Sequence, residues 1–320
     1  MPVFEMPLEQ LLVYQGTNPK PDDHKEYWER GIREMHALGT GYEATPAAFK
    51  APGVDCFDLY FTGVGGARVY AKLLIPRMEG KRPGLVRFHG YSGDSGDWMH
   101  HLAYTQAGFV VAAMDCRGQG GKSQDVGGVL GNTLNGQIIR GLDDPDPDKL
   151  LTRALFLDAA QLARIVMALP QVDDTRVGAT GGSQGGALTL ACASLEPRIA
   201  RLAPVYPFMC DYRRVWNMDL AVAAYNELRD YFRRFDPRHL REDEVFTKLG
   251  YIDLQHLARL IQGETLMLTG LMDTVCPPST QFAAYNKITA KKNYHLWPDF
   301  AHEGLPGGDD LIFGFMSQLL

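Results

Sequence analysis

The sequence lacks an excess of positive charge. Its 320 residues hold 32 Lys and Arg against 38 Asp and Glu, for a formal net charge of -6 at pH 7. Nucleic-acid-binding proteins usually present a basic face, so we expect no nucleic-acid partner. The same balance gives no attraction to an anionic membrane. No apolar run approaches the roughly 18 residues that a membrane-spanning helix needs, so we expect no membrane contact.

Cysteine is scarce, and none of the cysteines forms a CxxC pair. An odd number of scattered cysteines is typical of free thiols in a reducing compartment. The first eight residues hold no basic segment followed by an apolar one, so a secretory signal is not expected. We therefore predict a cytoplasmic location. The five cysteines are Cys56, Cys116, Cys192, Cys210 and Cys276.

Apolar strands alternate with helical segments through most of the chain. This alternation predicts an α/β fold with a mostly parallel central sheet and helices on both faces. The run 109–115 is continuously apolar, which is typical of a parallel strand covered on both sides. The other expected strands are 56–61 and 68–75, joined as a hairpin, then 83–88, the strand leading to Ser183, 199–206, 264–269 and 293–297.

Two segments depart from this alternation. Residues 1–45 are expected to form an N-terminal extension of helical character, and residues from about 210 to 262 a helical insertion over the top of the sheet. The length suits a large buried core. We predict one α/β domain spanning 1–320, with both segments attached to it.

The sequence Gly181-Gly182-Ser183-Gln184-Gly185 fits the G-x-S-x-G nucleophile elbow, in which a serine sits on a sharp strand-to-helix turn. A serine on so tight a turn has strained dihedral angles, and side chains at Gly181 and Gly185 would collide with the turn. The helix that follows places free N–H groups beside Ser183.

A serine hydroxyl is a weak nucleophile that needs a base, and the base needs an acid to orient it. In the α/β-hydrolase arrangement these residues follow in the order Ser, Asp, His, each after a strand. Asp273 follows the strand 264–269, and His302 follows the strand 293–297. We therefore predict Ser183, Asp273 and His302 as the catalytic residues. The backbone amides of Tyr91 and Gln184 are the predicted oxyanion-hole donors.

Three motifs in order make this sequence resemble the acetyl xylan esterase and cephalosporin C deacetylase family, carbohydrate esterase family 7. They are Arg117-Gly118-Gln119, the GxSQG elbow at 181–185, and His302-Glu303, with Asp273 at the position of the acid. The run 207–212 is also similar to the family's segment after the nucleophile, and the resemblance spans essentially the whole chain.

The resemblance implies removal of O-acetyl groups from acetylated xylo-oligosaccharides and from cephalosporin C-type antibiotics through an acetyl-enzyme. It also implies a homohexamer. This chemistry needs no metal and no organic cofactor, so we expect neither.

Arg117, Gly118 and Gln119 also have a physical interpretation. They follow the strand 109–115, near the elbow. A buried arginine there is expected to hold the elbow and oxyanion loops through its several donors. The acidic run 143–148 is compatible with a calcium site, but its two prolines and missing central glycine favour a solvated turn.

Other functions are compatible with parts of this pattern. A broader carboxylesterase or a serine peptidase can use the same fold and the same three residues. A non-catalytic ligand-binding protein is a further alternative, although binding alone requires no such set of residues. Reaction with a fluorophosphonate distinguishes the last alternative from the first two.

Overall fold

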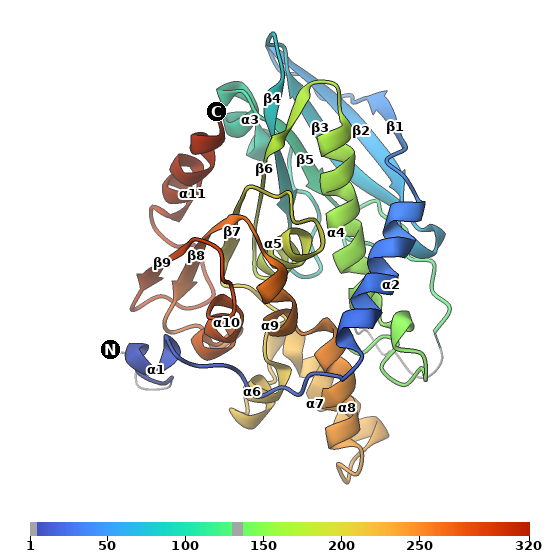
Figure 1. Ribbon diagram of the computed structural model, residues 1–320, viewed down its shortest axis with the longest axis vertical. Helices are drawn as coiled ribbons and strands as arrows, with labels where there is room; N and C mark the ends of the chain where they lie inside the picture. The colour runs from blue at the N-terminus through green and yellow to red at the C-terminus, as the bar shows by residue number, and fades with distance from the viewer. Residues whose placement is uncertain (1–4, 130–136) are drawn as a thin grey trace.

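A nine-stranded sheet runs through the computed structural model, which describes residues 5–129 and 137–320 (Figure 1). Its strand order is β1-β2-β3-β5-β4-β6-β7-β8-β9. The bounds are β1 Tyr42–Pro46, β2 Val54–Thr62, β3 Arg68–Pro76, β4 Arg82–Phe88, β5 Val110–Met114, β6 Val172–Gly182, β7 Arg201–Val205, β8 Glu264–Gly270 and β9 Lys292–Trp297.

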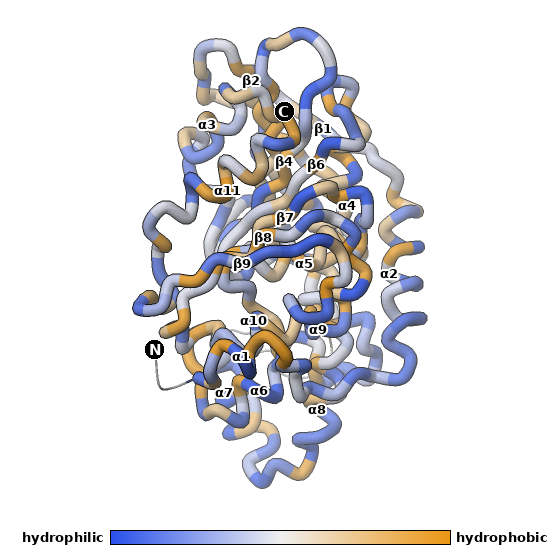
Figure 2. The backbone as a smooth tube through the Cα atoms, turned by 60° about the vertical axis from the view of Figure 1, so that its left-hand side comes forward, coloured by the Kyte–Doolittle hydropathy of each residue, from blue (hydrophilic) through white to orange (hydrophobic). Residues whose placement is uncertain are grey.

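The sheet changes from antiparallel to parallel at β5. Strands β1, β2 and β3 pair antiparallel, and β3 pairs antiparallel with β5. From β5 through β4, β6, β7 and β8 to β9, every pair is parallel. Every residue of β5 is buried, as expected for a strand covered on both faces. Strand β9 at the edge is partly exposed and largely hydrophilic in Figure 2.

Helices cover both faces of this sheet (Figure 1). Adjacent residues of β4 show the two sides, because Leu85 packs in the cluster with α3 (Met99–Ala107) and α11 (Gly308–Met316), whereas Val86 packs in the cluster with α4 (Leu151–Ala168) and α5 (Gln184–Leu195). Helix α10 (Pro278–Tyr285) follows β8. The predicted α/β architecture is therefore confirmed.

The N-terminal segment is less purely helical than predicted. After α1 (Leu8–Leu11) and α2 (His24–Ala37), residues 42–46 form β1 and pair with β2. All five residues of β1 are exposed, so they show no apolar alternation that identifies a strand. Helix α2 packs on α4, where Trp28 stacks on Phe156 with ring centroids 6.0 Å apart.

The segment between β7 and β8 is helical, as predicted. It contains α6 (Tyr212–Asn217), α7 (Asn226–Phe235), α8 (Glu242–Leu249) and α9 (Leu254–Leu257). These short helices surround buried aromatic side chains, and the segment lies at one end of the sheet (Figure 1). Within residues 5–129 and 137–320, no helix combines the length and apolar character needed to cross a membrane.

Candidate active site

Ser183 occupies the turn between β6 and α5. Its backbone has φ 59° and ψ -117°, a strained conformation for a residue with a side chain. A Cβ atom built on Gly181 would lie 2.5 Å from the carbonyl oxygen of Phe88, and one on Gly185 would lie 2.2 Å from the same oxygen. The end of β4 therefore passes so close to the turn that only glycine fits at both positions.

Ser183, His302 and Asp273 form one hydrogen-bonded chain. The Ser183 hydroxyl oxygen lies 2.9 Å from His302 Nε2, and His302 Nδ1 lies 2.8 Å from Asp273 Oδ2. The other carboxylate oxygen of Asp273 accepts the backbone N–H groups of Val275 and Cys276, each at 2.8 Å. The Nδ1 proton faces the carboxylate in this arrangement, which leaves Nε2 free to accept the serine proton.

Burial differs along this chain. Asp273 is fully buried, whereas the His302 side chain is 20% exposed. The ring of His302 lies against Tyr206, with centroids 4.5 Å apart. Tyr206 has a positive φ of 30°, and its backbone N–H donates to Leu268 at 2.7 Å. The partial exposure of His302 lets this base reach a substrate, while the buried Asp273 holds the imidazole from behind.

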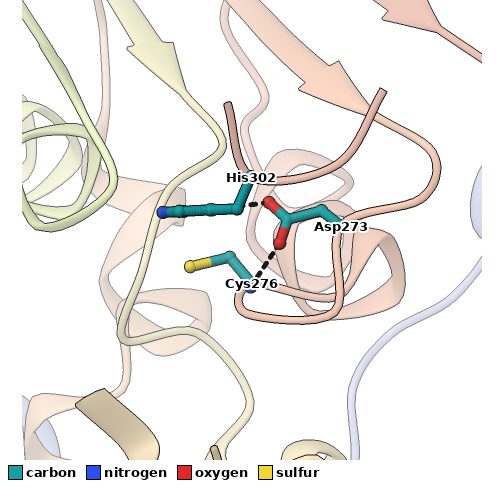
Figure 3. Close-up of side chains that lie close together, drawn as sticks. All are labelled: Asp273, Cys276 and His302. Carbon is teal, nitrogen blue, oxygen red and sulfur yellow. Dashed lines mark hydrogen bonds and ion pairs between the residues drawn. The ribbon is translucent and has the colours of Figure 1, made fainter. Parts of the chain in front are cut away.

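Cys276 is a further neighbour of these residues. Figure 3 shows Asp273 hydrogen-bonded on one side to His302 and on the other to the backbone of Cys276. Burial raises the pKa of the Cys276 thiol well above its ordinary value, and the charge of Asp273 adds to this effect, although contact with Ser183 acts in the opposite direction. This shift disfavours the thiolate, which is the reactive form of a cysteine.

The ligand atoms of Asp273, Cys276 and His302 lie within 4.8 Å of one another. This is compatible in kind with a metal, but the donors are already engaged. The carboxylate bonds His302 and two amides, and His302 also bonds Ser183. These residues therefore fit an acid–imidazole pair better than a metal centre, and the expected absence of a metal stays a prediction.

The loop after β4 holds the first predicted oxyanion-hole donor. His89 Nε2 accepts the backbone N–H of Cys116 at 2.9 Å, so the proton of His89 lies on Nδ1, which donates to the Gly90 carbonyl at 2.7 Å. The N–H of Gly93 donates to the same carbonyl at 3.1 Å. Because the peptide bond is trans, the N–H of Tyr91 points away from that carbonyl. Its orientation is thus set by groups around Gly90.

Gln184 and Gln119 link this loop to the elbow. The buried side chain of Gln184 and the side chain of Gln119 exchange two hydrogen bonds, at 2.8 and 3.0 Å. The side-chain oxygen of Gln119, Oε1, also accepts the backbone N–H of Ser92 at 2.8 Å. Gly118, between Arg117 and Gln119, has φ 68°, a conformation that favours glycine. The second predicted amide, that of Gln184, begins α5 directly after the serine.

Arg117 contacts other groups than we predicted. Its guanidinium bonds both carboxylate oxygens of Asp158 on α4, at 2.6 and 2.7 Å, and the Val64 carbonyl at 3.1 Å. Arg117 therefore joins the loop after β5 to α4. Gln119, in the same loop, makes the contacts to the elbow and to Ser92. The guanidinium is fully buried, and a buried charge requires a partner of opposite charge, which Asp158 provides.

Sequence reasoning missed three residues around this site. Asp158 is the lone acid within a long apolar helix, a pattern that can indicate a buried partner for an arginine. Burial raises the pKa of Asp158, although Arg117 acts in the opposite direction. Tyr206, which lies against His302, and Glu227, which accepts the hydroxyl of Tyr91, carry no comparable sequence signal.

The acidic run 143–148 is engaged by other side chains. Asp143 accepts from Tyr231 at 2.6 Å and pairs with Arg241 at 3.1 Å, and Asp148 pairs with Arg30 at 3.2 Å. These contacts agree with the turn interpretation and leave fewer carboxylate oxygens for calcium.

The chain is similar to proteins of known sequence and structure. A family model described as acetyl xylan esterase (AXE1) matches residues 1–319. Acetyl xylan esterase 1 from Thermoanaerobacterium sp. JW/SL YS485 is 58% identical, with TM-score 0.97 over 98% of this chain and 99% of that one. Acetyl xylan esterase from Paenibacillus sp. R4 is 32% identical, with TM-score 0.93 over 98% and 100%.

More distant similarities separate family from fold. Acetyl esterase Axe7A from Xylanibacter ruminicola is 26% identical over 295 residues, which cover 88% of this chain and 63% of that protein. This chain thus spans less than two thirds of that curated relative. Acylaminoacyl peptidase from Pyrococcus horikoshii is 17% identical, with TM-score 0.58 over 85% of this chain and 42% of that one, a likeness of fold alone.

Proposed function

This chain belongs to the acetyl xylan esterase (AXE1) family and has the α/β-hydrolase fold, and on that premise we propose that it is a serine esterase that removes O-acetyl groups. Its proposed substrates are small acetylated carbohydrates, chiefly xylo-oligosaccharides, and esters of cephalosporin C type. The observation that carries the proposal is the hydrogen-bonded chain from Ser183 through His302 to Asp273.

In the first half of the proposed reaction, Ser183 Oγ attacks the carbonyl carbon of the acetyl ester while His302 Nε2 takes its proton. Asp273 orients the ring and stabilises the imidazolium that forms. The amides of Tyr91 and Gln184 donate to the oxyanion of the tetrahedral intermediate. His302 then gives its proton to the leaving alcohol, and the acetyl group remains on Ser183.

In the second half, His302 takes a proton from water as the water attacks the acetyl-enzyme. A second tetrahedral intermediate collapses, acetate leaves, and the proton returns to Ser183. No metal or organic cofactor takes part in either half of the proposed reaction.

Rates on p-nitrophenyl acetate, butyrate and octanoate test the acetyl preference. We expect the rate to fall steeply from acetate to octanoate, whereas equal or rising rates would favour a broader carboxylesterase. Labelling with a fluorophosphonate should be lost in Ser183→Ala. A wild-type protein that resists labelling would instead favour a ligand-binding role. Release of acetate from a panel of acetylated xylo-oligosaccharides and cephalosporin C tests the two substrate classes.

We also propose that the chain assembles as a homohexamer, which is supported by family membership. Light scattering checks this, because a monomer has a mass of 35.5 kDa. A monomeric mass would contradict the proposal. A cytoplasmic location is proposed from the five buried free cysteines and is tested by cell fractionation.

A further inference from the structure

We infer that Glu227, on α7 of the helical insertion, is a positioning residue that holds Tyr91 and so sets the oxyanion loop for catalysis. This inference rests on the proposed esterase function and assigns that same site a control point outside its catalytic residues. Glu227 lies 136 residues from Tyr91 in the sequence, so only the folded chain brings them together.

Both carboxylate oxygens of Glu227 are engaged. Oε1 accepts the hydroxyl of Tyr91. Oε2 accepts three successive backbone N–H groups, those of Gln137 at 2.7 Å, Ile138 at 2.8 Å and Ile139 at 3.3 Å. A single side chain thus joins the loop after β4, the segment 137–139 and the insertion.

Among the residues that the structure describes, the carboxylate of Glu227 is held by hydrogen bonds alone. It is partly buried, and burial raises its pKa, although the three amides act in the opposite direction. It forms no ion pair with any cation in residues 5–129 or 137–320. An apolar side chain at this position would leave the Tyr91 hydroxyl and the three amides without their acceptor.

The neighbours of Tyr91 explain what the anchor does. The main chain is held on one side at the Gly90 carbonyl by His89 and Gly93, and on the other side at Ser92 by Gln119. Between these points, the Tyr91 hydroxyl is held by Glu227. Its ring also lies edge-on to Phe208, with centroids 6.0 Å apart.

Phe208 connects this anchor to the nucleophile, because its backbone N–H donates to the carbonyl oxygen of Ser183 at 3.1 Å. Glu227 therefore holds the side chain of Tyr91 against Phe208, which is bonded to the elbow. The backbone amide of Tyr91 is the proposed oxyanion donor. An oxyanion donor displaced by about 1 Å can reduce the rate by about 100-fold. Losing the anchor should thus lower kcat rather than substrate binding.

The test compares Tyr91→Phe, Glu227→Ala, the double variant and Glu227→Gln. Tyr91→Phe keeps the amide and the ring but loses the hydroxyl. We expect it to lower kcat on p-nitrophenyl acetate by about tenfold, the size of a hydrogen bond to a charged group, with KM changed less than about twofold. Glu227→Ala should lower kcat at least as much, and the double variant no further than Glu227→Ala. Glu227→Gln, which can still bridge both partners, should recover most of the rate.

Asp236→Ala is the matched control. Asp236 is a buried acid directly after α7 that also accepts backbone N–H groups, those of Leu240 at 2.9 Å and Arg241 at 2.8 Å, but it does not contact Tyr91. We expect Asp236→Ala to lower the melting temperature while leaving kcat and KM near wild type.

Affinity for methylboronic acid separates positioning from loss of structure. Its tetrahedral adduct with Ser183 places an oxygen in the oxyanion position, so its affinity should fall in proportion to kcat/KM in Tyr91→Phe and Glu227→Ala, while acetate binding does not. Three outcomes would each overturn the inference. The first is a loss of kcat in the double variant equal to the product of the two single losses. The others are a change confined to KM, and a Glu227→Ala variant that behaves like Asp236→Ala.

Wild-type activity and its loss in Ser183→Ala are measured first, so that the two proposals are read separately. An inactive wild-type protein would overturn both the esterase function and this inference. An active wild type whose Tyr91→Phe and Glu227→Ala variants keep full kcat would overturn this inference alone.

Discussion

Gln119 and Gln184 bond each other twice through their side-chain amides, and Gln119 bonds Ser92 as well. The end of the β5 loop, the first residue of α5 and the oxyanion loop are therefore joined by one pair of neutral side chains. Both carbonyl oxygens and both amide nitrogens face partners, so neither residue can be shortened without leaving a polar group unpaired.

Gln119→Ala should lower kcat/KM on p-nitrophenyl acetate by about tenfold, because it leaves the Gln184 amide and the Ser92 N–H without their partner. Steady-state kinetics measures this change. Gln171→Ala is the control, since Gln171 is exposed and lies before β6, at the opposite end of that strand from Ser183. Equal activity of both variants would show that the glutamine pair does not position the site.

Asp273→Asn should lower kcat by about 10³–10⁴-fold. The amides of Val275 and Cys276 require an acceptor, so the new side chain must turn its oxygen toward them and its NH₂ group toward His302. That NH₂ group donates to Nδ1 and forces the His302 proton onto Nε2, which then cannot accept from Ser183.

The control for this change is Asp299→Asn, an exposed acid three residues before His302, for which we expect wild-type kcat. Comparable losses in the two variants would mean that negative charge near the site matters in general, and not the pairing of Asp273 with His302.

Gly185→Ala should destabilise the protein by at least about 3 kcal/mol or prevent folding, because the new Cβ would lie 2.2 Å from the Phe88 carbonyl oxygen, which is backbone. Urea unfolding measures the free energy. Gly304→Ala offers a match in the loop after His302, where a Cβ meets nothing within 4 Å. We expect Gly304→Ala to stay within about 1 kcal/mol of wild type. Similar stability of the two variants would contradict the close approach of β4 to the elbow.

The contribution of His24 to the free energy of unfolding should fall as the pH drops from 6.5 toward 4. Burial lowers the pKa of His24 from 6.5 to about 4, and Lys20 acts in the same direction. In this window the unfolded chain binds the proton and the folded chain does not, so acid favours unfolding. A shift of this size corresponds to roughly 3 kcal/mol, fully lost below pH 4.

Urea unfolding of wild type and His24→Gln across this pH range isolates the effect. Burial raises the pKa of Asp253 to about 7, and this contributes with the opposite sign, but it is common to both proteins. The stability of wild type relative to His24→Gln should therefore fall by roughly 3 kcal/mol between pH 6.5 and 4. Parallel curves would show that His24 does not carry the dependence.

Several parts of the fold and site could be predicted from local patterns. The apolar run 109–115 indicated β5, and the GxSxG turn indicated the elbow. Both features depend on residues that are close together in the sequence. Strand β1 could not be predicted in this way. Its five exposed residues become a strand only by hydrogen-bonding to β2.

The partner of Arg117 illustrates the same limit within the site. The sequence indicated a buried arginine near the elbow, but its carboxylate is Asp158, 41 residues further along, on a helix that packs across the sheet. Which donor meets which acceptor depends on how helices pack on the sheet, and that packing is not encoded in any short window.

By itself, the sequence determined the order of strands β2 to β9 along the chain and the identity of Ser183, Asp273 and His302 as residues that follow three of them. Parallel strands end at one edge of a sheet, so chain order was enough to predict that these three side chains meet. Only the tertiary structure decided how they are supported. Gln119 at the elbow and Glu227 at Tyr91 act across long separations in sequence, because hydrogen-bond partners are chosen by the surfaces that folding brings together.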